Sequence, residues 1–195
     1  MGYTHFTVGL IEPLLHNVNT VIDLGAQNDF RESLPAPYIS DWYEKKSKLY
    51  VCIDLNGENN AYRWDLSQVL KFDKLNNTDL LVDAGTSEHV GHNGKFSWES
   101  IYNCWLNKHN LLKLNGHMVN ENPKTGNWPG HGFNYYTEDF YRNLENTGCY
   151  KILQLGEHPA MNNTTDGWNI YCVMQKVRED FITLEVFKTL GICTE

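Results

Sequence analysis

Short apolar runs that end in a polar residue or glycine recur along the whole chain. Seven of them have the length of β-strands, and several are rich in β-branched residues without strict alternation. Runs of that kind are typical of strands that are covered on both faces. The sequence therefore predicts strands over residues 20–25, 49–54, 61–64, 80–83, 116–120, 150–155 and 168–174.

Segments with helical periodicity lie between these runs. The clearest covers residues 96–112, where Ser97 is a suitable N-cap and Ile101, Trp105 and Leu112 fall near one face. Another begins at Thr137, with acidic residues in its first turn, where they suit the helix dipole. The complete set of predicted helices is 12–18, 39–48, 96–112, 137–146 and 179–190.

The alternation of strands and helices predicts an α/β fold, with a mostly parallel sheet and helices on both faces. The last two strands are joined by the polar stretch 156–167, which has no helical pattern. A long hairpin there makes the seventh strand antiparallel. No repeat, low-complexity tract or linker interrupts the chain, so we expect residues 1–195 to form a single domain.

Composition indicates which partners the protein can have and in which compartment it is found. The formal net charge of −8, without a Lys/Arg cluster, argues against nucleic acid as a partner. The five cysteines are an odd number without a C-x-x-C pair, which favours free thiols in a reducing compartment. Neither a signal peptide nor an apolar run of membrane-spanning length is visible. We therefore expect a cytoplasmic protein that does not enter the membrane.

Acidic residues occur at the ends of three consecutive predicted strands. Asp23 precedes the glycine turn at Gly25, Asp54 ends the second strand, and Asp65 follows the third. A glycine turn lets backbone approach a ligand, and a carboxylate can accept hydrogen bonds from ribose hydroxyls or an adenine amino group. Two of these residues also have a simpler interpretation: Asp54 as a turn aspartate and Asp65 as a helix cap for 66–70. The G-x-G-x-x-G fingerprint of a dinucleotide-binding dehydrogenase is absent.

Taken in order, this series resembles that of class I S-adenosylmethionine-dependent methyltransferases, over residues 18–177. The resemblance implies a Rossmann-like seven-stranded sheet with an antiparallel last strand, and S-adenosylmethionine as cofactor. It places the first glycine turn at the methionine part of the cofactor, the second acid at the ribose and the third at the adenine. The chain departs from the family at 26–28, where many members have a second glycine. The cofactor-binding residues that the resemblance implies are Asp23, Gly25, Ala26, Gln27, Asn28, Asp54, Leu55, Asp65, Leu66, Asp83 and Gly85.

The segment after the fourth strand, 83–90, resembles small methyltransferases of the FkbM-like or sugar-modifying kind. Its His89 is a candidate general base, because the pKa of histidine lies near working pH, and Glu88 is a candidate to orient it. Both residues can alternatively cap a turn or a helix start. Glu88, His89 and His92 also suggest a metal site, but a further ligand such as His117 or His131 has to come from a distant segment, so the sequence predicts no metal.

The acceptor side is predicted to lie in the loop after the fifth strand. There His131 is a second candidate for base or substrate anchor, and Trp128, Tyr135 and Tyr136 form a candidate stacking wall for a sugar or another planar acceptor. Residues 33–48, with Tyr38, Trp42 and Tyr43, are the candidate lid. The expected reaction is methyl transfer to an oxygen or nitrogen of a small-molecule or saccharide acceptor. The alternatives are an inactive binding domain or another enzyme that uses the same cofactor.

Overall fold

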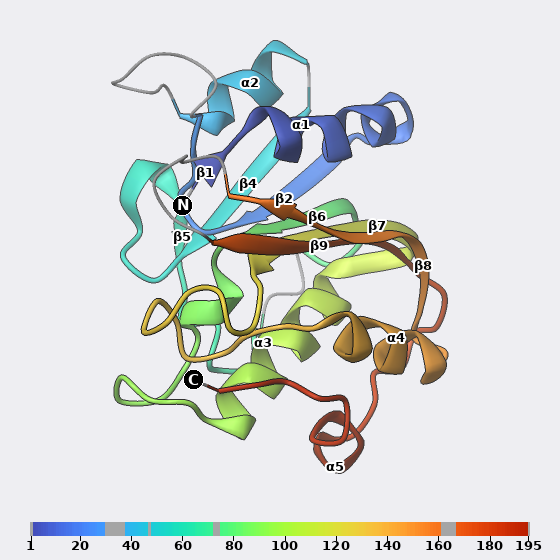
Figure 1. The fold of residues 1–195 in the computed structure, drawn as a ribbon. Helices are drawn as coiled ribbons and strands as arrows, with labels where there is room; N and C mark the ends of the chain where they lie inside the picture. The colour runs from blue at the N-terminus through green and yellow to red at the C-terminus, as the bar shows by residue number, and fades with distance from the viewer. Residues whose placement is uncertain (1, 30–37, 47, 72–74, 161–166, 195) are drawn as a thin grey trace.

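A seven-stranded sheet runs through the middle of the protein, in the strand order β5-β4-β2-β6-β7-β9-β8 (Figure 1). The computed structural model describes residues 2–29, 38–46, 48–71, 75–160 and 167–194. The strands of the sheet are β2 (Thr20–Leu24), β4 (Leu49–Asp54), β5 (Tyr62–Arg63), β6 (Thr78–Ala84), β7 (Leu112–Pro123), β8 (Tyr150–Pro159) and β9 (Trp168–Lys176). Two further strands, β1 (Gly2–Tyr3) and β3 (Asn28–Asp29), pair separately in parallel.

The strand directions confirm the predicted α/β fold. Strands β5, β4, β2, β6 and β7 pair in parallel, whereas β9 runs antiparallel to both β7 and β8. The sheet is thus a Rossmann-like, mostly parallel sheet whose last strand in the chain is reversed. Because β2, β4 and β6 are parallel neighbours, their carboxyl ends meet at one edge, where open α/β sheets bind ligands.

Helices cover both faces of the sheet (Figure 1). One face packs against α1 (His5–Ile11) and α2 (Ile39–Lys45), and the other against α3 (Trp98–Leu111), α4 (Glu138–Asn146) and α5 (Leu184–Phe187). Each face has its own hydrophobic core. In β2, Val21 packs into the core on the side of α1 and α2, and Ile22 packs into the core on the side of α3 and α4, as the alternation of side chains along a strand requires. All seven residues of β6 are buried, which explains why this run shows no alternation of polar residues.

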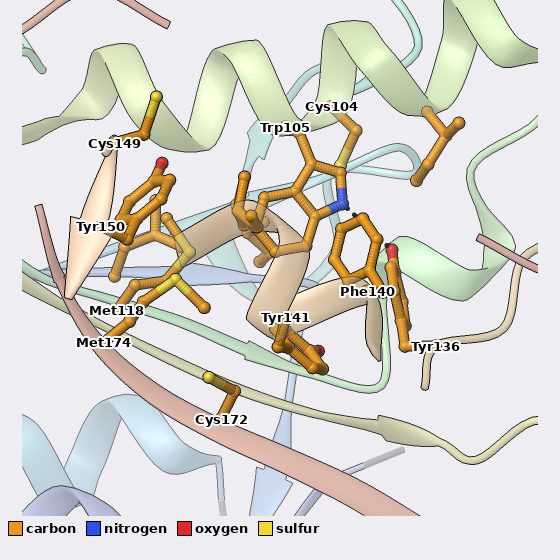
Figure 2. Close-up of a cluster of buried hydrophobic side chains, with 14 of the residues drawn as sticks. Cys104, Trp105, Met118, Tyr136, Phe140, Tyr141, Cys149, Tyr150, Cys172 and Met174 are labelled. Atoms are coloured by element: carbon orange, nitrogen blue, oxygen red, sulfur yellow. Dashed lines mark hydrogen bonds between the residues drawn. The ribbon is translucent and has the colours of Figure 1, made fainter. Parts of the chain in front are cut away.

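The larger core lies between α3, α4 and the sheet. Trp105 of α3 packs edge-on against Phe140 of α4 and against Tyr136, and its indole N–H donates to the Tyr136 hydroxyl (Figure 2). Cys104, Cys149 and Cys172 lie in this core and Cys52 is also buried; the structure pairs none of the five cysteines. Free thiols agree with the prediction. Within the described residues, no helix has the length and apolarity needed to cross a membrane.

Two predicted helices begin where their caps were expected. The Ser97 side chain accepts from Ser100 N at the start of α3, and the Thr137 side chain accepts from Phe140 N at the start of α4. Both caps satisfy an amide that has no partner within its helix. The predicted boundaries of α3 and α4 are therefore correct to within two residues.

The helix predicted at 12–18 is present, but as a 3₁₀ helix, and the sequence analysis did not predict the α-helix that precedes it. The α-helix lies earlier, at His5–Ile11, because Thr4 and Thr7 form a reciprocal capping box there. A 3₁₀ helix, Glu12–Asn17, follows it. Pro13 lies in the first turn of that segment and has no N–H to continue the α-helical hydrogen bonds.

The predicted helix at 179–190 is largely wrong, because only Leu184–Phe187 is α-helical. Side chains of α3 hold the preceding backbone in another conformation: the carbonyl of Glu179 bonds to His109 Nε2 at 2.8 Å, and that of Ile182 accepts from Tyr102 at 3.0 Å. Thr183 then caps the short helix. Periodicity alone does not reveal carbonyls that are occupied by a distant helix.

Candidate functional site

A cavity of about 520 Å³ opens at the carboxyl ends of β2, β4 and β6. It brings together residues that the sequence distributes over five segments. The predicted residues that line it are Gly25, Ala26, Gln27, Asp54, Leu55, Asp65, Leu66, Gly85 and His89. The sequence interpretation missed Ile53, Trp64, Thr86, Val90, Gly91, Asn93, Gly94 and Phe133, which complete the lining.

The turn after β2 forms one wall of the cavity and requires glycine at its first position. Gly25 has a φ of +85°, and a Cβ there would clash with the Thr86 hydroxyl. That hydroxyl donates to the carbonyl of Leu24 at 2.6 Å and accepts from Gln27 Nε2 at 3.1 Å. The hydrogen bonds of Thr86 thus connect the end of β2 to the end of β6. The sequence did not predict this role of Thr86.

Asp54 connects the second strand to the same turn. Its Oδ2 accepts from the amide of Ala26 at 2.7 Å, and its Oδ1 accepts from Asn56 N at 2.9 Å. The turn interpretation of Asp54 is therefore correct, and the residue lines the cavity as well. Each carboxylate oxygen has a second lone pair, so Asp54 can still accept from ligand hydroxyls.

Asp65 lies farther along the same wall. Its Oδ1 accepts from Ser67 N at 2.9 Å, so the residue caps a turn, and the helix that was considered for 66–70 is absent. Trp64 and Leu66 line the cavity on either side of it. An apolar and an acidic side chain are thus available next to each other, as the recognition of a heterocycle with an amino group requires.

Three of the predicted cofactor residues do not line the cavity. Asn28 lies in β3, paired with Gly2 of β1. Asp23 is fully buried and accepts from the Tyr50 hydroxyl at 3.2 Å; burial raises its pKa well above the usual range. Asp83 is also fully buried and forms an ion pair with Lys108. Direct cofactor contact by these side chains is therefore not supported by their positions.

Asp83 acts instead as an internal anchor. Its Oδ1 accepts from the amides of Thr86 and Ser87, both at 3.1 Å, and its Oδ2 meets the Lys108 ammonium. Burial alone would raise the pKa of Asp83, but the Lys108 charge and the hydrogen bonds from Ser87 lower it below the usual range. The anchor fixes the turn that carries Gly85, Thr86 and the residues that follow.

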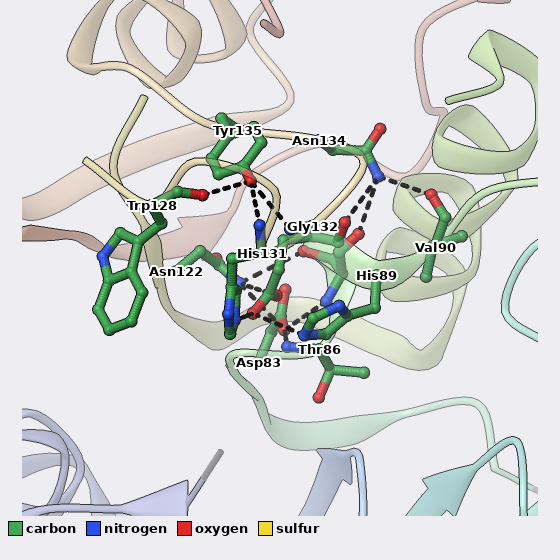
Figure 3. Close-up of polar contacts among 12 residues, drawn as sticks. Asp83, Thr86, His89, Val90, Asn122, Trp128, His131, Gly132, Asn134 and Tyr135 are labelled. Atoms are coloured by element: carbon green, nitrogen blue, oxygen red, sulfur yellow. Dashed lines mark hydrogen bonds and ion pairs between the residues drawn. The ribbon is translucent and has the colours of Figure 1, made fainter. Parts of the chain in front are cut away.

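Next to the cavity, Glu88 lies against two histidines from different parts of the chain. Its Oε1 is 3.5 Å from His89 Nε2 and 3.8 Å from His131 Nε2, and the two imidazole centroids are 4.9 Å apart (Figure 3). Burial, followed by the Asp83 charge, raises the pKa of Glu88 to about 8. Burial lowers the pKa of His89 and of His131. We call these three residues the Glu88 cluster.

The loop that carries His131 is held tightly against the Glu88 backbone. The Asn134 side-chain amide donates to the carbonyl of Val90 at 2.6 Å, and the amides of Phe133 and Asn134 both donate to the carbonyl of Glu88 (Figure 3). Gly132 permits this approach, because a Cβ there would lie 2.8 Å from the Glu88 carbonyl oxygen. The position of His131 is therefore set by packing and hydrogen bonds.

The other histidines considered for a metal site lie elsewhere. His92 is exposed in a turn that closes on Lys95, and His117 lies in β7, where burial, followed by the Lys113 charge, lowers its pKa. Neither belongs to the group of Glu88, His89 and His131, whose candidate ligand atoms all lie within 4.8 Å of one another.

The predicted aromatic wall is mostly interior. Tyr135 and Tyr136 are fully buried, so they cannot stack on an acceptor. The Tyr135 hydroxyl instead organises the loop, accepting from the amides of His131 and Gly132 and donating to the carbonyl of Trp128 (Figure 3). Trp128 alone of the predicted wall is partly exposed, with its ring centroid 5.1 Å from that of His131.

The candidate lid is only partly described. Residues 33–37 and 47 lie outside the described residues. Tyr38 is exposed, whereas Tyr43 is fully buried and its hydroxyl lies 3.0 Å from that of Tyr3. None of the described residues of this segment lines the cavity, so Tyr43 is a core residue and the lid remains a prediction for Tyr38 and Trp42.

Comparisons with known proteins identify structures with a similar fold. No family model and no curated protein matches the chain. Among solved structures, a Burkholderia thailandensis 1,6-didemethyltoxoflavin-N1-methyltransferase with bound S-adenosylhomocysteine is similar, with a TM-score of 0.64, 12% identity and 89% of this chain and 78% of that chain covered. A S-adenosylmethionine-dependent methyltransferase from Methanosarcina mazei is similar with a TM-score of 0.63, 11% identity and coverage of 91% and 99%.

A third similar structure is SpnF, which is described as a [4+2]-cyclase, with a TM-score of 0.56, 9% identity and coverage of 91% and 83%. At such low identities the likeness concerns the fold, and the cyclase shows that the fold accommodates more than one reaction. The strand order, the reversed last strand and these structural neighbours agree: the chain has the fold of the class I S-adenosylmethionine-dependent methyltransferases.

Proposed function

We propose that the protein is an S-adenosylmethionine-dependent methyltransferase that acts on an oxygen or nitrogen of a small-molecule or saccharide acceptor. One observation carries the proposal. In a methyltransferase fold, a single cavity at the strand ends contains the Gly25 turn, Asp54 and Asp65 in the order in which the cofactor's methionine, ribose and adenine parts are expected.

The residues present fit that cofactor. The cavity of about 520 Å³ lies within the roughly 300–1,000 Å³ that small-molecule sites occupy. Gly25 and Ala26 both line the cavity, so the backbone of this turn can contact the methionine part. Asp54 would hold the ribose hydroxyls beside Leu55, and Asp65 would accept from the adenine amino group while Leu66 packs against the ring.

The chemistry requires alignment and the removal of a proton. A bound S-adenosylmethionine supplies an activated methyl group on its sulfonium, so the protein itself has to orient the acceptor. His89 lines the cavity, and His131 adjoins it through Glu88. We assign His89 or His131 to accept the proton from the acceptor, and Glu88 to hold both rings in position.

The acceptor binds on the side of the cavity that the Glu88 cluster borders. Phe133 lines the cavity there, and Trp128 lies against His131. Both can pack on a planar or sugar acceptor. The didemethyltoxoflavin of the Burkholderia structure is a small molecule, which supports the same class of acceptor here.

Calorimetry with S-adenosylmethionine and S-adenosylhomocysteine, with NAD as the comparison ligand, tests the proposal. We expect both sulfur compounds to bind and NAD not to bind. Asp54→Asn should weaken binding by about 10- to 100-fold, because hydrogen bonds to a charged group contribute about 1.5–3 kcal/mol. Glu58→Gln, an exposed acidic residue on the same loop, is the matched control and should bind as wild type does. Absence of binding to the wild type would refute the proposal.

A reaction without methyl transfer is the alternative that the similarity to SpnF favours. Product analysis separates the two. Formation of S-adenosylhomocysteine together with a methylated acceptor identifies a transferase. An acceptor converted with S-adenosylmethionine left intact identifies another reaction on the same fold.

A further inference from the structure

The Glu88 cluster presents three donor atoms of the kinds that bind transition metals. Glu88 Oε1, His89 Nε2 and His131 Nε2 all lie within 4.8 Å of one another, and Glu88 Oε1 is 3.5 and 3.8 Å from the two nitrogens. In a tetrahedral site with metal–ligand distances of about 2.1 Å, neighbouring ligand atoms are roughly 3.4 Å apart. The two separations from Glu88 already approach that value.

Two of the three donors lack any other partner. Glu88 Oε1 and His131 Nε2 are buried atoms without a hydrogen bond. A buried polar atom without a partner costs about 1–3 kcal/mol, so native proteins seldom keep two of them facing each other without a ligand. Among the described residues, the only ion-pair contacts of Glu88 are with these two histidines, and no lysine or arginine neutralises it.

The cluster is held in place by neighbouring groups. Glu88 Oε2 accepts from Asn122 Nδ2 at 3.2 Å, which leaves Oε1 directed toward the histidines. Asn134 fastens the His131 loop to the backbone at Glu88 and Val90. Metal ligands are oriented in this way by outer hydrogen bonds, and such preorganisation lowers the cost of bringing the donors together.

We propose that Glu88, His89 and His131 bind a divalent transition-metal ion at the acceptor side of the cavity. Two imidazoles and one carboxylate favour ions such as Zn²⁺, Co²⁺ or Mn²⁺ over Mg²⁺ or Ca²⁺, which prefer sites made of oxygen ligands. The sequence predicted no metal here, because it considered the nearby His92 and could not place His131. The fold supplies the third ligand from 42 positions farther along the chain.

Three protein ligands leave the metal with open positions, and His89 lines the cavity into which these would face. For the metal's task the inference rests on the proposed function. A hydroxyl group of the acceptor binds an open position, and its pKa falls. With the metal bound, His89 and His131 are ligands, so neither takes the proton as it would in the metal-free site. The O–H proton leaves to solvent, the oxygen forms a bond to the methyl carbon, and the carbon–sulfonium bond breaks to give S-adenosylhomocysteine. The acceptor atom is then an oxygen.

Cobalt is the most informative probe, because its visible absorption reports ligation without any need for activity. Protein stripped with EDTA is titrated with Co²⁺, and Mg²⁺ is added as competitor. We expect one equivalent of Co²⁺ to bind and Mg²⁺ not to displace it. Glu88→Gln and His131→Gln should each weaken binding by at least about tenfold, whereas His92→Gln, which alters an exposed histidine three positions after His89, should leave it unchanged.

Near-UV circular dichroism confirms that each variant is folded. The inference is overturned if folded wild type binds no Co²⁺, or if Glu88→Gln and His131→Gln bind it as tightly as wild type does. S-adenosylmethionine binding is measured on the same samples. Co²⁺ binding without cofactor binding supports the metal site and refutes the proposed function; cofactor binding without Co²⁺ binding does the reverse.

Discussion

Two buried carboxylates, five positions apart, are treated in opposite ways by this fold. Asp83 faces the Lys108 ammonium and accepts two backbone amides, so its charge is neutralised inside the protein. Glu88 is equally buried, but among the described residues it pairs with no lysine or arginine, and one of its oxygens has no hydrogen-bond partner. Asn122 lies between them, with its Nδ2 3.4 Å from Asp83 and 3.2 Å from Glu88. The first carboxylate is part of the framework, and the second is available to a ligand.

Removal of the cation from the first carboxylate should have the largest effect. Lys108→Met leaves the Asp83 charge buried and unpaired, and it also removes a bond to Asn120, so we expect a loss of about 3–5 kcal/mol in the free energy of unfolding. Urea denaturation measures it. Lys113→Met is the comparison, because its Asp79 partner keeps backbone donors and the lysine is partly exposed; there the loss should stay below about 1 kcal/mol. Equal losses would show that burial of the pair is unimportant.

The region around α3 should also show a pH dependence through His109. This histidine bonds to the Tyr150 hydroxyl and to the Glu179 carbonyl, and burial, followed by the nearby Lys176 charge, lowers its pKa to about 4. The unfolded chain takes up the proton near pH 6.5. Between those values the unfolded state binds more protons, so stability falls as the pH decreases from about 6.5 to 4.

The size of this contribution is roughly 2–3 kcal/mol over that interval, because each unit of pKa shift corresponds to about 1.4 kcal/mol. Urea denaturation at several pH values measures it. His109→Gln should flatten the dependence, whereas His5→Gln, which alters an exposed histidine, should not. A slope unchanged by His109→Gln would mean that the acidic side chains alone cause the pH dependence.

On the cavity side, Gly25→Ala should affect both stability and ligand binding. The left-handed conformation costs an alanine about 1–2 kcal/mol, and the new methyl group would clash with Thr86. We therefore expect urea denaturation to show a free energy of unfolding lowered by at least about 1–2 kcal/mol, and calorimetry to show weaker S-adenosylmethionine binding. Gly9→Ala is the opposite case: Gly9 lies in α1 with open space around it, so alanine should stabilise by about 0.5–1 kcal/mol. A neutral Gly25→Ala would contradict the assigned turn geometry.

The residues that could be predicted from the sequence lie at strand ends, and those that could not depend on partners that only the packed structure brings together. Strand ends follow directly from apolar runs, and parallel neighbours bring their ends together, so Gly25, Asp54 and Asp65 could be assigned to one cavity in advance. The position of Asp23 could not, because only the packed structure shows that its side chain meets Tyr50 in the interior. The partner of Glu88 was equally out of reach, since His131 arrives through a loop fixed by Asn134 and Tyr135.

The smallest stability change, and the clearest test of the contrast, is expected from Glu88→Gln. An amide of nearly the same shape removes the acidic group from a buried position, so in EDTA we expect the free energy of unfolding to stay constant or rise by up to about 1 kcal/mol. Asp83→Asn should instead lose about 3–5 kcal/mol, because Lys108 is left unpaired. Added Co²⁺ should raise the stability of wild type more than that of Glu88→Gln, because a ligand that binds the folded state more tightly stabilises it more. If both substitutions destabilise alike, Glu88 is a framework residue as Asp83 is, and its unpaired oxygen has no ligand to hold.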